Sequence, residues 1–149
     1  MRKAFYIGYK GRLEAYIYIW FSKQYRFVYV GETNNINGVI GRACQHVTRG
    51  QGTLYSRVDD EGYDIQEIND FVLLSYPLPR QKKFMTEESA YRISVEYLVQ
   101  KKLYALRREV DRPYKMLSSV TTGPCTGMKS IDHIADKIAY DFVDIYQNE

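Results

Sequence analysis

The sequence predicts a single α/β domain spanning residues 1–149, with a small central antiparallel sheet of about three strands, helices on both sides and an added C-terminal helix. A chain of 149 residues, 45% of them hydrophobic, is long enough for one domain with a buried core. Three patterns indicate this class. Two tyrosine-rich apolar runs lie close together, a third apolar run is closed by prolines, and two later segments have helical periodicity.

The first two strands form a predicted β-hairpin. Residues 16–21 (YIYIWF) and 27–31 (FVYVG) are mostly aromatic and β-branched residues, which favour strands. The polar residues 22–26 between them are expected to form the turn. A short extra edge strand is predicted before the hairpin, at residues 3–9.

Beyond the hairpin, a loop rich in asparagine and glycine occupies residues 32–38. The short helix predicted after it carries Arg42 and His46 four residues apart, and therefore on one face. The strand tyrosines and these two side chains converge on a small volume, which makes it a candidate site. Taken singly, each of these residues is also compatible with ordinary packing or with a polar helix face.

The third strand is predicted at residues 71–79 (FVLLSYPLP), a continuous apolar run that we place at the centre of the sheet. Residues 47–70 before it are polar and punctuated by glycine, with a helix expected from residue 53. The acidic run at residues 59–61 would end that helix. Nothing in the sequence orients these carboxylates, so a solvated surface is favoured there over a metal site.

The longest helix is predicted to begin at Thr86, as its N-cap, and to continue to about residue 109, before Pro113. Its apolar residues form two sectors, and Glu96 falls between them. A carboxylate beside a buried face is costly unless a cation compensates it. Two partners remain open for Glu96: an ion pair with Arg92, one turn earlier, or a metal ion.

The last predicted element is an amphipathic helix over about residues 130–146, with Ser130 as its cap. Apolar residues recur along it at helical spacing. Two roles are open for this apolar face, because it can pack on the sheet or mediate homodimerisation.

The net charge of +3 conceals a strong segregation of charge along the chain. Residues 1–49 have a balance of +6 and residues 80–115 a balance of +5, whereas residues 50–79 have a balance of −5. Clustered positive charge favours a polyanionic partner through phosphate contacts and counterion release. A solvated basic surface is the alternative.

The sequence also predicts a cellular compartment. No apolar run is long enough to span a membrane, and the basic N-terminus lacks the apolar core of a signal peptide. Cys44 and Cys125 are far apart and have no metal-ligand spacing. These features predict a cytoplasmic protein with reduced thiols and no membrane partner.

Several of these motifs, taken together, resemble the GIY-YIG nucleases. Tyr16-Ile17-Tyr18 stands where the first motif of that family is expected, and Tyr29-Val30-Gly31 stands where the second is expected. Arg42 and His46 match the family's Arg-x3-His helix, and Glu96-Tyr97-Leu98-Val99 resembles the segment that carries its catalytic glutamate. The resemblance covers roughly residues 14–115.

The resemblance has two departures. Tyr16 replaces the first glycine, and Lys115 stands where the family has an asparagine after a Pro-Tyr segment. That asparagine is expected to shape the site around the glutamate or the metal. A lysine there either turns away to contact DNA or lowers the activity.

The resemblance implies a metal-dependent endonuclease that hydrolyses DNA phosphodiester bonds without a covalent enzyme intermediate. By position, Glu96 would bind Mg²⁺ or Mn²⁺ and Arg42 would hold the scissile phosphate. Tyr18 would orient or deprotonate the attacking water, and Tyr29 would position phosphate or water. His46 would act as a proton shuttle or as the partner of Tyr18.

The basic residues of the second positive block are the expected DNA contacts: Arg80, Lys82, Lys83, Lys101 and Lys115. Two other functions stay open. The chain is alternatively a nucleic-acid-binding module on the same fold without catalysis, or an interaction protein that dimerises through its C-terminal helix and does not bind nucleic acid.

Overall fold

The computed structural model describes residues 15–34, 38–48, 52–118 and 122–149. The edge strand predicted at residues 3–9 lies outside these ranges. In chain order, the elements are β1 (Tyr16–Ser22), β2 (Phe27–Thr33), α1 (Gly38–Val47), α2 (Thr53–Asp60), the 3-10 helix η2 (Ile65–Glu67), β3 (Val72–Pro77), α3 (Lys82–Met85), α4 (Ala90–Leu106), β4 (Lys115–Met116) and α5 (Lys129–Asn148).

The described strands form one mixed sheet in the order β3-β1-β2-β4. β1 and β2 form the predicted antiparallel hairpin, with Tyr18 opposite Gly31, and β3 pairs antiparallel with the other edge of β1. β4 contributes Lys115 and Met116, which run parallel to the start of β2. The prediction of an α/β domain is confirmed. The prediction of three antiparallel strands is wrong, because the sheet has four strands and one pair is parallel.

Both differences in the sheet have a physical cause. A strand of two residues has no hydrophobic period that a sequence pattern can detect, so β4 escapes prediction. β3 lies at an edge and not at the centre, and only Leu74 and Ser75 in it are buried. Its continuous apolar run comes from being sandwiched between helical layers on both faces.

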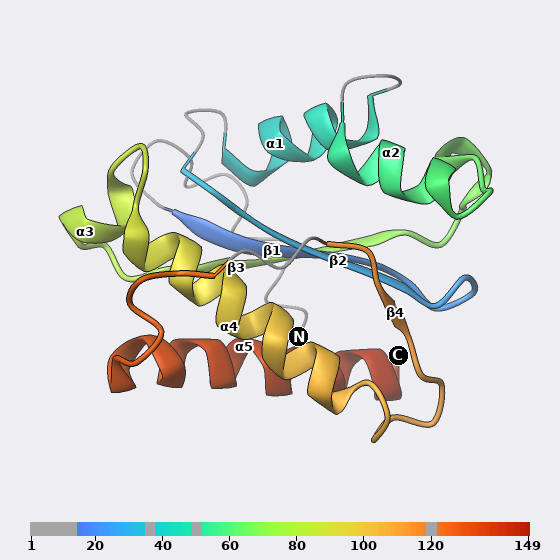
Figure 1. The fold of residues 1–149 in the computed structure, drawn as a ribbon. Coiled ribbons are helices and arrows are strands. Elements are labelled where there is room, and N and C mark those ends of the chain that lie inside the picture. The colour runs from blue at the N-terminus through green and yellow to red at the C-terminus, as the bar shows by residue number, and fades with distance from the viewer. Residues whose placement is uncertain (1–14, 35–37, 49–51, 119–121) are drawn as a thin grey trace.

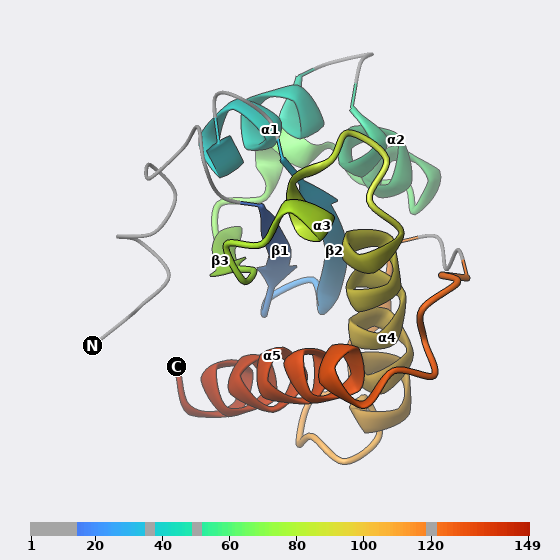
Figure 2. The same ribbon diagram turned by 90° about the vertical axis from the view of Figure 1, so that its left-hand side faces the viewer.

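Helices cover both faces of the sheet (Figure 1, Figure 2). α1 and α2 lie on one face, over an aromatic core that includes Tyr16, Tyr18 and Tyr29. α4 and α5 lie on the other face, over a more aliphatic core that includes Ile17 and Ile19. Because side chains alternate along a strand, β1 supplies both cores from neighbouring residues.

The start of α4 differs from the prediction of a Thr86 cap. The cap is Ser89, whose hydroxyl accepts a hydrogen bond from the backbone N–H of Arg92 at 3.1 Å. Thr86 is extended and ends the separate short helix α3. Arg92 binds the backbone carbonyls of Thr86 and Glu87, and these bonds hold the chain between α3 and α4 in a non-helical turn.

The predicted C-terminal helix is present as α5, and its apolar face packs inside the chain. Ser130 is not its cap, because the helix begins at Lys129 and Met128 is the N-cap residue. Ile131, Ala135 and Phe142 are buried, and the Phe142 ring meets Phe21 of β1 edge to face, with ring centroids 5.5 Å apart. Of the two roles open for this helix, packing on the sheet is observed. The homodimer predicted through this helix stays a prediction.

Within the described residues, no helix combines the length and the apolarity needed to cross a membrane.

Candidate active site

The ring of Tyr18 lies across Gly31, its partner in the β1–β2 register. A Cβ atom at residue 31 would overlap both the Cζ atom and the hydroxyl of Tyr18. Glycine is therefore required at this position by the close approach of a neighbouring strand's side chain. This contact gives the Tyr-Val-Gly motif a physical meaning, because it frees the space that the Tyr18 ring occupies.

Tyr18, Tyr29 and His46 form a buried cluster between the sheet and α1. The Tyr18 hydroxyl is hydrogen-bonded to Nε2 of His46, which is 2% exposed. The ring centroid of His46 lies 5.4 Å from that of Tyr18 and 5.3 Å from that of Tyr29, and the two tyrosine centroids are 6.5 Å apart. Three of the predicted site residues are thus in mutual contact.

Burial fixes the protonation states of this pair. It lowers the pKa of His46 to about 4, with a further contribution from the charge of Arg42. Burial also raises the pKa of Tyr18, and the neighbouring Tyr29 adds to that effect. The protonated hydroxyl of Tyr18 therefore donates a hydrogen bond to Nε2 of the neutral His46. The other ring nitrogen, Nδ1, is buried without a partner among the described residues.

Arg42 is the cation that acts on this cluster. Its charge and a hydrogen bond to Tyr18 lower the pKa of that tyrosine, although less than burial raises it. The side chain is half-buried, and its Nη1 also donates to Oε1 of Gln45 at 2.9 Å. An exposed glutamine is easily exchanged for a stronger acceptor such as phosphate.

Glu96 reaches the same region from α4, on the opposite helical layer. The pKa of its carboxyl is raised to about 8, mainly by burial and also by the charge of Glu32. The charges of Arg42 and Arg92 only partly offset this rise. Its Oε1 accepts a hydrogen bond from Nε2 of Gln100 at 3.3 Å. The ionised carboxylate therefore lacks sufficient positive charge around it.

Arg92 is not the ion-pair partner of Glu96 that the sequence left open, because it pairs with Glu32 instead. Arg92 is 2% exposed, and its remaining N–H groups donate to the carbonyls of Phe84, Thr86 and Glu87 at 2.7–2.8 Å. Sequence reasoning missed Glu32. The sequence does contain a signal for it. Side chains alternate along a strand, so Glu32 lies on the same face of β2 as the core residues Val28 and Val30, where a charged residue is unusual.

Gln100 is a second residue that sequence reasoning missed. β4 pairs with only the first two residues of β2, which leaves the edge of β2 open farther along. Two side chains close that edge at Val30: its N–H donates to the Ser118 hydroxyl at 3.2 Å, and its carbonyl accepts from Gln100 at 3.4 Å. Gln100 thereby connects β2 to Glu96.

Lys115 lies away from this cluster. Its ammonium pairs with the carboxylate of Glu61 at 2.6 Å, and the residue sits opposite Phe27, five residues before Glu32 on β2. Five residues of strand separate those positions by about 16 Å. The acidic run at residues 59–61 is mostly exposed, as expected for a solvated segment.

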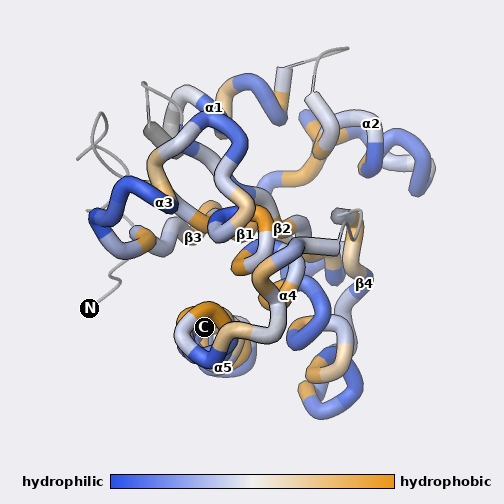
Figure 3. The backbone as a smooth tube through the Cα atoms, turned by 60° about the vertical axis from the view of Figure 1, so that its left-hand side comes forward, coloured by the Kyte–Doolittle hydropathy of each residue, from blue (hydrophilic) through white to orange (hydrophobic). Residues whose placement is uncertain are grey.

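The other expected DNA contacts fall into two groups. Arg80, Lys82 and Lys83 belong to α3 and the residues before it, a stretch that is hydrophilic in Figure 3. Asn34 fixes this stretch at the end of β2 by donating to the carbonyls of Met85 and Thr86 at 3.0 and 3.2 Å. Lys101 is exposed on α4, about 140° around the helix from Glu96. Of the two groups, the first is the one whose neighbouring backbone contacts the end of β2.

The residues fit a hydrated divalent cation. Within the described residues, no three or more His, Cys, Asp or Glu side chains gather in a way that could hold a metal ion. A single carboxylate is nevertheless enough for Mg²⁺, which keeps most of its waters. Glu96 supplies an under-compensated carboxyl, and beside it the Oε1 atom of Gln100 is buried without a hydrogen-bond partner among the described residues.

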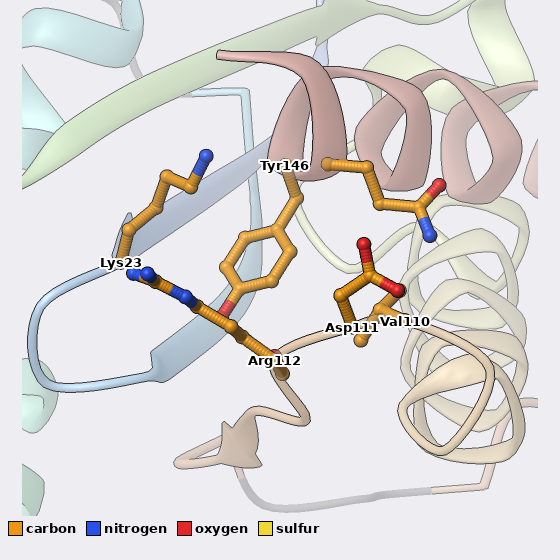
Figure 4. A pocket seen from close by; sticks show the side chains of 6 residues that line it. Lys23, Val110, Asp111, Arg112 and Tyr146 are labelled. Carbon is orange, nitrogen blue, oxygen red and sulfur yellow. The ribbon is translucent and has the colours of Figure 1, made fainter.

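A separate hollow of about 290 Å³ lies at the opposite end of β1 and β2 (Figure 4). Tyr146 of α5 projects into it between Lys23 and Asp111, and its hydroxyl donates to the carbonyl of Arg112 at 3.0 Å. None of the predicted site residues lines this hollow.

Comparison of the chain with protein-family models, with curated proteins and with solved structures gives no match.

Proposed function

We propose that this protein is an endonuclease that hydrolyses DNA phosphodiester bonds with the help of one Mg²⁺ or Mn²⁺ ion. One observation carries the proposal. A hydrogen-bonded Tyr18–His46 pair, the cationic Arg42 and the under-compensated Glu96 converge at the end of β2 from both helical layers. Phosphodiester hydrolysis needs these parts: an activated water, positive charge on the phosphate and stabilisation of the leaving oxygen.

The proton path uses the Tyr18–His46 hydrogen bond. Tyr18 alone cannot take a proton from water, because burial raises the pKa of its hydroxyl and so keeps the oxygen protonated. It becomes effective when it passes its own proton to the neutral Nε2 of His46 as it takes one from the attacking water. The hydroxide so formed attacks phosphorus directly, and no bond forms between phosphorus and the protein.

Arg42 binds the scissile phosphate in this mechanism. Its planar guanidinium matches two phosphate oxygens and stays charged at every accessible pH. Tyr29 packs against His46 and helps to orient the phosphate or the water. Glu96 would hold the divalent ion, which when bound supplies positive charge to the phosphate and to the leaving oxygen.

The basic stretch Arg80, Lys82 and Lys83 supplies the proposed DNA surface. The contacts of Asn34 hold this stretch beside the end of β2, so a phosphate backbone can cross it on its way to Arg42. Such contacts release counterions, and DNA affinity should therefore fall steeply with salt.

Incubation of the purified chain with supercoiled plasmid tests the proposal. We expect relaxed or linear products with Mg²⁺ or Mn²⁺ and none with EDTA. Salt-dependent DNA binding without cleavage would contradict the nuclease and support the second candidate, a nucleic-acid-binding module. One observation favours that candidate, namely the raised pKa of Tyr18 in the resting protein. Absence of both binding and cleavage would leave only a protein-interaction role.

A further inference from the structure

The carboxamide of Gln100 is buried with one half unsatisfied. The residue is 1% exposed, and its Nε2 donates to Oε1 of Glu96 at 3.3 Å and to the carbonyl of Val30 at 3.4 Å. Its Oε1 has no hydrogen-bond partner among the described residues. A buried acceptor left unpaired destabilises the folded state, and such a group calls for an explanation.

The surroundings of this oxygen indicate what would satisfy it. The carboxamide touches the carboxyl of Glu96, and the charge of Glu32 is close enough to act on the same carboxyl. The groups that meet here offer oxygen atoms as possible metal ligands, and two of them are the acidic carboxyls of Glu96 and Glu32. Mg²⁺ and Mn²⁺ prefer carboxylate, carbonyl and water oxygens.

We propose that Oε1 of Gln100 and the carboxylate of Glu96 together bind the divalent cation, so that Gln100 is a second protein ligand of the metal. This inference rests on the proposed function, since it concerns the ion that Glu96 would hold. Glu32 remains paired with Arg92 and adds negative charge to the site without being a ligand.

The fold prepares this pair of ligands in advance. Glu96 and Gln100 are four residues apart on α4 and therefore on one face of the helix. The hydrogen bond from Gln100 to Val30 ties that face to the open edge of β2. These contacts order the carboxamide beside Glu96 before any ion binds, which favours affinity.

The test measures Mn²⁺ binding by isothermal titration calorimetry on the full chain, without DNA. It compares the wild type with Gln100→Leu, Gln100→Glu and the control Gln66→Leu, which changes an exposed glutamine on η2. Gln100→Leu should weaken Mn²⁺ binding by about tenfold or more. Gln100→Glu keeps an oxygen at this position and should bind Mn²⁺ at least as tightly as the wild type, and Gln66→Leu should leave binding unchanged.

Two results would overturn the inference. Equal affinity of wild type and Gln100→Leu would show that the oxygen is not a ligand. Equal weakening by both Gln100 variants would show that Gln100 acts only through its N–H groups, by holding Glu96 and Val30. Because Gln100→Glu keeps the size of the side chain, it stays informative if Gln100→Leu fails to fold.

The Glu96→Gln variant separates this inference from the proposed function. If wild type binds Mn²⁺, Glu96→Gln does not and Gln100→Leu does, only the role of Gln100 is lost. If wild type binds no Mn²⁺ at millimolar concentration, the metal site and the metal-dependent nuclease are both overturned.

Discussion

Two buried polar clusters flank the end of β2, and they differ in how completely their groups are paired. In the first, the Arg92 guanidinium bonds to one carboxylate and to three backbone carbonyls. In the second, around Tyr18, His46 and Glu96, the atoms His46 Nδ1 and Gln100 Oε1 lack partners among the described residues. Fully paired buried groups are typical of structural clusters, whereas unpaired and perturbed ones are typical of binding and catalytic sites.

The two clusters also differ in charge compensation. Arg92 and Glu32 neutralise each other, and the remaining donors of Arg92 hold the turn before α4. Glu96 has no such partner, so burial keeps its pKa at about 8. The comparison favours a role in folding for the first cluster and supports the proposed role of the second in binding a cation and a phosphate. Variants of each should therefore have different consequences.

The largest expected effect is on catalysis, from Glu96→Gln. This near-isosteric change removes the anionic metal ligand, so plasmid cleavage should fall by about 10³-fold or more. DNA binding should persist, because the basic residues proposed to contact the phosphates are unchanged. The exposed Glu88→Gln is the matched control and should cleave like wild type. A lower melting temperature with unchanged cleavage would show that Glu96 has a structural role and that it is not the ligand of the metal ion.

The next effect is on stability, from Arg92→Met. The change leaves the partly buried Glu32 carboxylate and three carbonyls without their donor, and should lower the free energy of unfolding by about 3 kcal/mol. Urea denaturation measures this loss. The double variant Glu32→Met, Arg92→Met should recover part of it, because it removes the uncompensated charge. If Arg92→Met is as stable as wild type, the contrast between the two clusters is wrong.

Most of the fold could be predicted from the sequence, because the signals that carry it are local. The β1–β2 hairpin, α5 and a long helix containing Glu96 all followed from periodicity and composition. β4 did not, since its two residues are held by pairing with Phe27 and Val28 and by no pattern of their own. The edge position of β3 is likewise a property of tertiary pairing.

The site could be predicted only in part. Tyr18, Tyr29 and His46 were named in advance and lie together, because strand register and helix period bring them to one place. Glu32 and Gln100 depend on contacts across 60 and 70 residues of chain, which no local pattern reveals. These two residues decide which carboxyl stays uncompensated and which oxygen stays free.

A smaller catalytic effect is expected from Tyr18→Phe. The variant cannot pass a proton from water to His46, so the cleavage rate should fall by about 10²-fold, while Kd for DNA stays near that of wild type. Loss of the hydroxyl also leaves Nε2 of His46 unpaired at a cost of about 1 kcal/mol. Rates and affinities measured separately would test this, and a change confined to affinity would remove Tyr18 from the proton path.

The pH dependence of stability offers a comparison within the second cluster. The Glu96 pKa is raised to about 8, so the folded state holds this proton more tightly than the unfolded chain does. Stability should therefore fall as the pH rises from 4.5 to 8. The His46 pKa is lowered to about 4, so stability should fall as pH drops from 6.5 to 4. The Glu96 contribution is on the order of 5 kcal/mol and the His46 contribution on the order of 3 kcal/mol.

Urea denaturation across this range would separate the two titrations. Glu96→Gln should remove the fall in stability toward pH 8 (the alkaline side of the profile) and leave the fall toward pH 4 (the acid side) unchanged. His46→Gln should do the reverse. Mg²⁺ should also flatten the alkaline side, because it binds the ionised form of Glu96. An unchanged alkaline slope in Glu96→Gln would show that another group titrates there.

The smallest effect should come from Lys115→Asn, which places a carboxamide where the GIY-YIG nucleases have their asparagine. The wild-type ammonium is paired with Glu61 near the start of β2, about 16 Å along the strand from Glu32. An exposed ion pair contributes under about 1 kcal/mol, so the melting temperature should change little. Cleavage should stay within about twofold of wild type, since the carboxamide beside Glu96 is already supplied by Gln100.

A large gain in cleavage by Lys115→Asn would mean that residue 115 approaches the metal when DNA is bound, and that the arrangement around Glu96 in the free protein is incomplete. A loss of DNA affinity with a shallower salt dependence would instead place Lys115 on the phosphate backbone, as the sequence predicted.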